Sequence, residues 1–328
     1  MRAVWYERTG AAADVLLVGE LPDPHPGPGE VRVRVHRAGL NPRDVKRRAG
    51  LGDRVMTEPR VIPGDDGAGV LDEVGRGVAP ARLGERVWVY FANYQRPFGT
   101  MADYVVVPSC QAVPLPQAAS FEEGACLGIP ALTAHRGVYA DGPVAGQSIL
   151  VTGGAGAVGH YAIELAKEAG AHVIATASTP AKLHSARAAG ANAVIDRYAP
   201  ALAEAILCAT GGRGLDRVID VAFGANLPVI AEVLAPNGTI ATYASQADPT
   251  PAVPFYPLMR LGAVIRMVSV FAMPRPALRQ AIDDVAVLTE HGALSHPIAA
   301  RLPLEASVQA HQLMEEGTVP GKVIVTLR

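Results

Sequence analysis

The sequence predicts an α/β fold that combines a doubly wound parallel sheet with a second, β-rich domain. From residue 148 to residue 245, short apolar runs alternate with alanine-rich stretches of helical length, as expected for a parallel sheet covered by helices. A glycine-rich turn at residues 154–159 separates the first apolar run from the first helical stretch. The first third of the chain is instead dense in glycine and proline and carries short β-like runs. Because 328 residues is about twice a typical domain of ~150, we expect two domains.

Composition indicates a folded protein of balanced charge. Hydrophobic residues make up 49% and charged residues 18% of the chain, which favours a packed core over disorder. The 29 basic and 31 acidic residues give a net charge of −2, so nucleic acid is not an expected partner. Cys110, Cys126 and Cys208 form no CxxC pair and suggest neither disulfides nor a thiolate zinc site. A leader and a run of about 18 apolar residues are lacking, so we expect a cytoplasmic protein without a membrane partner.

The first third predicts a compact β-rich barrel. Its strand-like runs are separated by turn clusters such as PDPHPGPGE, and they read VRVRV at 31–35, GERVWVY at 84–90 and ADYVVV at 102–107. From about Phe121 the pattern becomes helical, with an interruption expected at Pro130. We therefore expect a domain boundary near this point.

The last part of the chain adds one strand and a tail. The apolar segment 262–270 predicts a further strand of the parallel sheet. Amphipathic helices are expected over residues 277–289 and 304–316, followed by the closing strand KVIVTLR. This tail need not belong to the same domain as the parallel sheet.

Residues 154–159 read GAGAVG, a complete G-x-G-x-x-G directly after a strand and directly before a helix. In a Rossmann fold, the first glycines bring backbone N–H groups against a pyrophosphate, and the last glycine lets the helix pack on the strand. The helix N-terminus then faces the anion with its positive dipole end. A turn that serves packing alone is the alternative, but the βαβ context favours dinucleotide binding.

The end of the second strand favours NADPH over NADH. NAD-binding versions usually carry an acid about 20 residues after the loop, whereas this chain reads ATAST at 175–179. The hydroxyls of Ser178 and Thr179 can donate to a 2′-phosphate, and Lys182 can supply charge. Alternatively, Ser178 or Thr179 only caps the helix that starts near Pro180, and Lys182 is a solvated lysine.

Taken together, these segments resemble the zinc-independent, zeta-crystallin-like quinone oxidoreductases of the medium-chain dehydrogenase/reductase superfamily. The resemblance covers essentially the whole chain through AGLNPRDVKRRAG, PGDDGAGVLDEVGRGV, GERVWVY, GTMADYVVVP, GIPALTAHRGV, VTGGAGAVG and GKVIVTL. It implies a GroES-like catalytic domain over residues 1–123 and 272–328 and a Rossmann NADPH-binding domain over residues 124–271. It also implies a homodimer, for which the predicted strand 262–270 offers a sheet edge.

The resemblance further implies the site residues, position by position. It places the catalytic, nicotinamide-side contacts at Asn41 and Thr133. Cofactor-binding residues are then Asn41, Thr133, Ala155, Gly156, Ala157, Val158, Ser178, Lys182, Arg197, Tyr243, Ala244, Ser245, Val270, Phe271 and Lys322. The segment 243–245 has independent support, because ligands bind at the carboxyl ends of parallel strands. An ordinary strand-to-helix loop is the alternative for it.

Two departures from the superfamily's patterns matter. Zinc-dependent members carry a Cys where residues 39–41 stand and a His-Glu pair where Asp65 and Asp66 stand, so we expect no metal and a local use of both carboxylates in the turn. Many relatives have a tyrosine where this chain has Lys46. That lysine is either a cationic donor or part of a solvated helix face on which Asp44 contacts Arg48, and the solvated face is slightly favoured.

We therefore predict an NADPH-dependent reductase that passes hydride to a quinone or a similar conjugated carbonyl. An enone or enoyl reductase is the first alternative, and it would need a proton donor such as Lys46 or Tyr94. A non-catalytic NADPH-binding protein is the second alternative, because a fold alone does not establish turnover. We expect the loops 91–98 and 252–259 to form the substrate wall.

Overall fold

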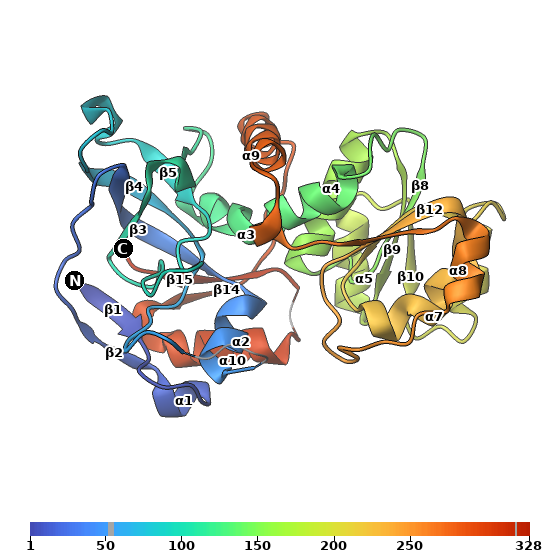
Figure 1. Cartoon of the computed structure of the whole chain (residues 1–328), viewed down its shortest axis with the longest axis horizontal. Coiled ribbons are helices and arrows are strands. Elements are labelled where there is room, and N and C mark those ends of the chain that lie inside the picture. Colours follow the sequence, from blue (N-terminus) through green and yellow to red (C-terminus); the bar gives the residue numbers. More distant parts are fainter. Residues whose placement is uncertain (52–55, 319) are drawn as a thin grey trace. The chain divides into compact units, whose positions relative to one another are not determined.

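The computed structural model describes residues 1–51, 56–318 and 320–328 (Figure 1). The chain forms two compact units, which we call the first and the second unit. The first unit comprises Met1–Ile129 and Ile282–Arg328, and the second comprises Pro130–Ala281. The domain boundaries predicted from the sequence, at 123/124 and 271/272, stay a prediction.

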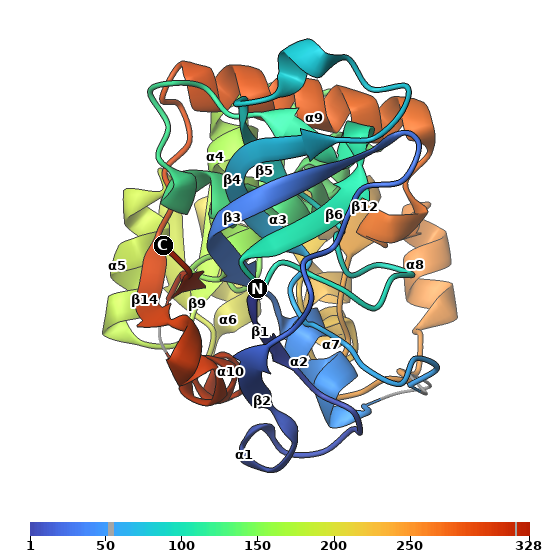
Figure 2. The ribbon, with the colours of Figure 1, turned by 90° about the vertical axis from the view of Figure 1, so that its left-hand side faces the viewer.

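The first unit is built on a seven-stranded mixed sheet (Figure 2). Alternation of buried Val31, Val33 and Val35 with arginines explains why its long central strand has one face in the core. A small antiparallel pair, β1 (Arg2–Trp5) and β2 (Leu17–Glu20), forms a separate two-stranded sheet. The main sheet runs in the order β14 (Ile298–Pro303), β15 (Lys322–Thr326), β3 (Glu30–Leu40), β4 (Asp66–Val74), β5 (Arg86–Val89) and β7 (Ala112–Pro114), with β6 (Tyr104–Pro108) also paired to β3.

Strand register in the first unit brings three chain segments together. The closing strand β15 pairs antiparallel with β3, so that Val323 lies opposite Leu40. On its other side β3 pairs antiparallel with β4, with Gly39 opposite Asp66. The C-terminal end of β3 and the N-terminal ends of β4 and β15 therefore meet. This unit contains the helices α1 (Ala12–Val15), α2 (Pro42–Ala49) and α10 (Ser307–Glu316), while α3 (Phe121–Tyr139) and α9 (Arg275–Glu290) each belong partly to both units.

The second unit contains a six-stranded, all-parallel sheet (Figure 1). Its strand order is β10 (Ala193–Asp196), β9 (His172–Ala177), β8 (Ser148–Val151), β11 (Leu215–Asp220), β12 (Leu234–Thr242) and β13 (Val264–Met267). The connecting helices are α4 (Ala157–Glu168), α5 (Pro180–Ala188), α6 (Leu202–Ala209), α7 (Phe223–Val233) and α8 (Phe255–Leu261). The strand order reverses between β8 and β11, which is the doubly wound Rossmann arrangement. The predicted fold class is confirmed.

Two predicted elements differ in detail. Helix α3 (Phe121–Tyr139) breaks at Gly128, where φ is 4° and ψ is −117°, and Pro130 stands just after the break rather than causing it inside a continuous helix. The predicted strand 262–270 is shorter, because Gly262 ends α8 in the left-handed region and Val270 begins a 3₁₀ turn. Over residues 1–51, 56–318 and 320–328, every helix is too short or too polar to cross a bilayer.

A histidine is buried in the first unit without hydrogen bonds. His311 on α10 is 0% exposed, and neither of its ring nitrogens has a hydrogen-bond partner among the described residues. Burial, together with the nearby positive charge of Arg48, lowers the pKa of His311 to about 3. The folded protein therefore keeps this ring neutral at any ordinary pH.

We predict that His311→Leu makes stability less sensitive to acid. An unfolded histidine takes up a proton as the pH falls below about 6.5, while folded His311 stays neutral down to about 3. Its contribution to the free energy of unfolding is thus complete above pH 6.5 and is lost progressively as the pH falls toward 3. Urea midpoints measured between pH 7 and pH 5 should fall less in His311→Leu than in the wild type. At pH 7 the variant should be as stable or about 1 kcal/mol more stable, because an unsatisfied polar ring is removed.

The exposed His184, changed to Leu, is the matched control and should leave the acid dependence unchanged. A wild-type acid dependence in His311→Leu would contradict the prediction.

Candidate functional site

Asn41 stands at the junction of β3 and α2, and its side chain is held inside the first unit. Its backbone N–H donates to Asp44 Oδ2 (2.8 Å), which leaves the carboxamide available for other partners. Asn41 Nδ2 donates to Asp66 Oδ2 (2.8 Å), and Asn41 Oδ1 accepts from Lys322 Nζ (2.7 Å). Lys322 Nζ also donates to Asp66 Oδ2 (2.8 Å). The three side chains form a closed, hydrogen-bonded triangle, which we call the Asn41–Asp66–Lys322 triad.

All three side chains of the triad are almost completely buried. Asn41, Asp66 and Lys322 are only 2%, 0% and 2% exposed. A charged group in such surroundings is tolerated when it is both paired and hydrogen-bonded, and here the carboxylate and the ammonium pair with each other. The resemblance assigned Lys322 to the cofactor, whereas in the structure its ammonium group is occupied by Asn41 and Asp66.

Backbone packs closely around the triad. A Cβ atom at Gly39 would lie 2.0 Å from the Ala125 carbonyl oxygen and 2.7 Å from Lys322 Cε. A Cβ atom at Gly128 would lie 2.0 Å from Asp66 Oδ1, and Ile129 N–H, just after the break in α3, donates to the same oxygen (2.9 Å). Glycine is therefore required at both positions by close approach. Thr133 is 5% exposed and follows Ile129 by one turn along α3.

The neighbouring carboxylates also have assigned partners. Asp65 forms an ion pair with Arg43 and accepts Asn93 N–H (3.2 Å), while Asp44 accepts Gly64 N–H (3.2 Å) as well as Asn41 N–H. Burial raises the pKa of Asp44 to about 7, with a further contribution from the negative charge of Asp65. Burial likewise raises the pKa of Asp65.

The preferred interpretation of the α2 face was wrong. Asp44 and Arg48 are each only 1% exposed, so they do not belong to a solvated face. Asp44 accepts backbone N–H groups instead of contacting Arg48, and Arg48 forms an ion pair with Glu315 and donates to the Gly10 carbonyl. The polar residues at helical spacing suggested solvent exposure. The pattern could not show that α10, which is remote in the sequence, covers this face and supplies the partner of Arg48. Lys46 is partly buried on the same helix.

The glycine loop of the second unit has the geometry of a phosphate cradle. Gly154 N–H donates to the Thr176 carbonyl (2.9 Å), which fixes the turn after β8. A Cβ atom at Gly159 would lie 2.4 Å from the Gly153 carbonyl oxygen, so α4 packs too closely for any side chain there. Gly156 caps α4 without a side chain, and the first backbone N–H groups of the helix have no partner within it. Ala155, Ala157 and Val158, which the resemblance assigned to the cofactor, all lie in this turn and the start of α4.

Two predicted 2′-phosphate residues lie at one edge of the sheet. Ala177 pairs with Asp196 across β9 and β10, so Ser178 and Arg197 follow neighbouring strand ends, and Arg197 N–H donates to the Ala177 carbonyl (2.9 Å). Thr179 Oγ1 accepts Lys182 N–H (3.3 Å) and therefore acts as the helix cap foreseen by the alternative interpretation.

The loop 243–245 is held against the start of α7. Ser245 Oγ accepts Gly224 N–H (2.9 Å) and donates to the Asp248 carbonyl, and Ala244 O accepts Phe223 N–H (2.9 Å). Tyr243 N–H donates to the Asp220 carbonyl (3.1 Å). Burial raises the pKa of the Tyr243 phenol. The hydroxyl of Ser245 thus serves the loop itself, while Val270 and Phe271 lie in the 3₁₀ turn after β13.

Asp220 organises this sheet edge and was missed by the sequence analysis. Its carboxylate accepts from Thr152 Oγ1 (2.8 Å), Thr242 Oγ1 (3.2 Å) and Asn226 Nδ2 (2.7 Å). Burial raises its pKa, although these hydrogen bonds oppose the shift. An acid at the end of the apolar run DRVID was the available signal.

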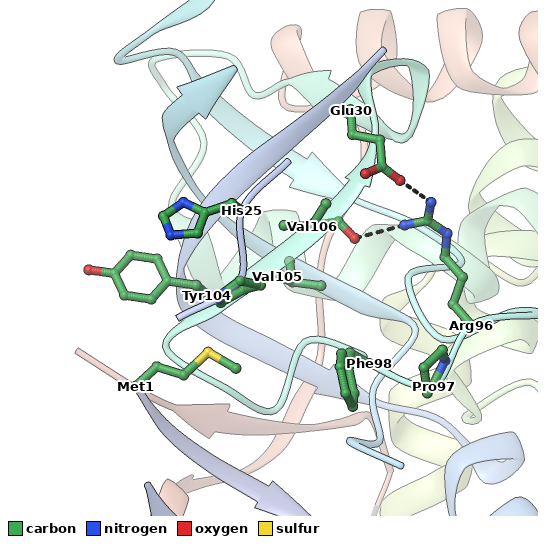
Figure 3. A pocket seen from close by; sticks show the side chains of 10 residues that line it. Met1, His25, Glu30, Arg96, Pro97, Phe98, Tyr104, Val105 and Val106 are labelled. Atoms are coloured by element: carbon green, nitrogen blue, oxygen red, sulfur yellow. Dashed lines mark hydrogen bonds and ion pairs between the residues drawn. The ribbon is translucent and has the colours of Figure 1, made fainter. Parts of the chain in front are cut away.

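The first unit contains a pocket of about 320 Å³, and Figure 3 shows the side chains that line it. Arg96, Pro97 and Phe98, from the predicted substrate-wall loop 91–98, contribute to its lining. Arg96 donates to the Val106 carbonyl (2.9 Å) and forms an ion pair with Glu30. None of the predicted catalytic or cofactor-binding residues lines this pocket.

Two family models match the chain, one in each part of it. The family described as "Alcohol dehydrogenase GroES-like domain" matches residues 27–117, and the family described as "Zinc-binding dehydrogenase" matches residues 157–286. Among the described residues, no group of three or more His, Cys, Asp or Glu side chains is arranged to hold a metal ion.

Curated relatives match over nearly their full length. A rat quinone oxidoreductase is 27% identical over 331 residues, covering 100% of this chain and 98% of the relative. A 2-haloacrylate reductase from a Burkholderia species is 28% identical over 342 residues, covering 99% of this chain and 98% of the relative.

Solved structures agree in fold. A structure described as an NAD-dependent alcohol dehydrogenase is 31% identical with a TM-score of 0.89, and each chain covers 100% of the other. A mycobacterial protein solved in complex with NADPH is 27% identical with a TM-score of 0.88, again with full coverage of both chains.

Proposed function

The chain belongs to the medium-chain dehydrogenase/reductase superfamily, and on this premise we propose that it is an NADPH-dependent reductase of quinones or similar conjugated carbonyl compounds. The observation that carries the proposal is the presence in one chain of a dinucleotide loop at residues 154–159 and a rigidly held carboxamide at Asn41. Relatives named as quinone oxidoreductases support the acceptor class.

The cofactor loop fits a dinucleotide. Gly159 leaves no room for a side chain, and the first backbone N–H groups of α4 have no partner within the helix, which suits a pyrophosphate. Ser178 and Arg197 at the neighbouring ends of β9 and β10 suit a 2′-phosphate, and the end of β9 carries no acid to repel it. One structural relative is named NAD-dependent, so the preference for NADPH rests on these residues.

When bound, NADPH supplies the hydride. The protein's residues then have to hold the two reactants in contact and exclude side reactions. We assign the orientation of the nicotinamide end to Asn41 and Thr133. A quinone demands little acid catalysis, because reduction restores its aromaticity and water can protonate the product oxygens.

We further propose that turnover needs no bound metal. Asp65 and Asp66 stand where zinc-dependent relatives have ligands, and they form ion pairs with Arg43 and Lys322. Binding a metal there would have to displace both cations, the partly exposed Arg43 and the buried Lys322. The predicted local use of both carboxylates in the turn was therefore wrong. Asp65 pairs with Arg43 on α2 and accepts Asn93 N–H, and the partners of Asp66 lie at the start of α2, on β15 and on α3.

Reduction of a C=C bond is the second candidate, supported by a relative named as a reductase of 2-haloacrylate. Such a reaction needs a proton donor beside the carbon that does not receive hydride. Lys46 and Tyr94 are the residues that we proposed for this role. The ring of Tyr94 lies 5.7 Å from the guanidinium carbon of Arg43, which places this phenol next to a cation.

We also propose a homodimer formed through β13. This strand is the edge of the six-stranded sheet, and its Val264 and Met267 are 43% and 69% exposed. On the preceding helix α8, Phe255, Tyr256 and Met259 are more than half exposed. An unpaired strand edge beside apolar side chains suits a second copy that pairs its own β13 across a two-fold axis.

The reductase activity is tested by NADPH oxidation with matched quinone and enone panels, in buffer containing a chelator. We expect quinones to be reduced faster than enones, at a rate that the chelator does not lower. Lys46→Ala should cost little with a quinone. A loss of ~10²–10⁴ in kcat confined to the enone would instead indicate C=C reduction with Lys46 as the acid. Failure to oxidise NADPH with every acceptor would favour the non-catalytic alternative.

The cofactor preference is tested with Lys182→Ala. A charge-assisted hydrogen bond is worth ~1.5–3 kcal/mol, so the Kd for NADPH should rise about tenfold or more. The Kd for NADH should stay nearly unchanged, because NADH lacks the 2′-phosphate. Lys167→Ala, in the last turn of α4, is the matched control and should affect neither Kd. An equal loss for both cofactors would contradict the assignment.

The dimer is tested by sedimentation of Met267→Glu. The substitution places like charges on both copies at the shared edge, so a dimeric wild type should become monomeric at micromolar concentration. Val287→Glu, at an exposed valine of α9, should remain dimeric. A monomeric wild type would overturn the proposal.

A further inference from the structure

The Asn41–Asp66–Lys322 triad allows only one orientation of the Asn41 carboxamide. In that orientation the amide nitrogen faces a carboxylate at 2.8 Å and the amide oxygen faces an ammonium at 2.7 Å. A rotation of the amide by 180° would bring its nitrogen against Lys322 and its oxygen against Asp66. Both contacts would then join like partners in a buried site, where such mismatches are most costly.

Asp66 connects this amide to a second element. Its Oδ2 accepts from both Asn41 and Lys322, and its Oδ1 accepts Ile129 N–H, just after the break in α3. The carboxylate is thus the point at which β3, β15 and α3 are joined. The carboxylate packs directly against the backbone of Gly128, where a Cβ atom would lie 2.0 Å from Asp66 Oδ1, so any side chain at position 128 would displace the carboxylate.

We propose that Asp66 and Lys322 are positioning residues, which hold the Asn41 carboxamide in one orientation toward the nicotinamide end of the cofactor. Lys322 acts through Asn41 rather than by binding a cofactor phosphate. This inference rests on the proposed reductase function, but its structural part does not depend on turnover.

The first experiment reverses the polarity of the triad. Asp66→Asn keeps an oxygen for Ile129 N–H but turns an amide NH₂ toward Asn41 Nδ2 and the Lys322 ammonium. We expect Tm to fall by about 5 °C or more and kcat to fall at least tenfold. The exchange variant Asn41→Asp/Asp66→Asn restores complementarity, because Asp at 41 accepts from both Asn at 66 and Lys322, with no change in net charge.

The exchange variant should therefore recover most of the lost Tm without recovering kcat, since position 41 no longer carries a carboxamide. Purely structural residues would recover both quantities together. A Tm no higher than that of Asp66→Asn would overturn the hydrogen-bond assignment. Full recovery of kcat would overturn the positioning role.

The second experiment asks whether Lys322 touches the cofactor. Binding of 2′-phospho-ADP-ribose, which lacks the nicotinamide ring, is measured by calorimetry in Lys322→Met. We expect its Kd to stay within threefold of the wild type, while kcat falls at least tenfold at an unchanged KM for NADPH. A tenfold weaker Kd for this fragment would show a direct phosphate contact and overturn the proposal.

A double variant keeps this experiment informative if Lys322→Met leaves Asp66 unpaired and unfolds. In Asp66→Asn/Lys322→Met both charges are gone, and Asn at 66 can donate to the oxygen of a reversed Asn41 amide. We expect a folded protein with normal fragment binding and low kcat. A double variant with wild-type kcat would contradict the positioning role.

Lys167→Met is the control for these variants and should match the wild type in Tm, kcat and fragment binding. If none of the tested acceptors supports oxidation of NADPH by the wild type, the proposed function fails. The Tm comparison still decides the structural part of the inference.

Discussion

The arrangement of the Asn41–Asp66–Lys322 triad depends on the ion pair between Asp66 and Lys322. Both groups are almost completely buried, so each needs the other's charge as well as hydrogen bonds. The pairing exists only because β15, β3 and β4 are aligned in one register. A slip of one residue in either pairing would turn these side chains to the opposite face of the sheet. The ion pair therefore forms only in this register, and it in turn stabilises this register over a slipped one.

The second unit applies a related principle with neutral partners. Asp220, at the end of β11, accepts from hydroxyl groups at the ends of the two flanking strands and from the Asn226 amide on α7. Burial raises the pKa of this carboxyl, although its hydrogen bonds oppose the shift. In both units a buried carboxylate at a strand end ties together segments that are distant in sequence, and the loops needed for ligand binding are attached to those fixed points.

Features that depend on neighbouring residues were predictable from the sequence. The parallel sheet follows from alternating apolar and helical segments, and the loop 154–159 follows from glycines at fixed spacing between a strand and a helix. The cap at Thr179 also depends only on local sequence. Asn41, by contrast, was identified through resemblance, because nothing local distinguishes it from any other helix cap.

Features that depend on remote partners were not predictable. The Asp65-Asp66 pair suggested a turn that uses its carboxylates locally, but Lys322 and Ile129 reach Asp66 through sheet register and a helix break. Arg48 seemed to belong to a solvated face because its partner Glu315 is on α10. Periodicity describes which residues share a face of one helix, but it carries no information about which other element covers that face.

The late position of Lys322 in the chain has a consequence for synthesis. Lys322 is separated from Asn41 by 281 residues and from Asp66 by 256 residues. Contacts of such long range close large loops and form slowly. While the ribosome is still adding the second unit, β3 has already emerged, and its edge waits for β15 with the carboxylate of Asp66 lacking its counter-ion. The nascent chain therefore passes through an interval in which this edge of β3 is open, and an open strand edge is a template for pairing with other chains.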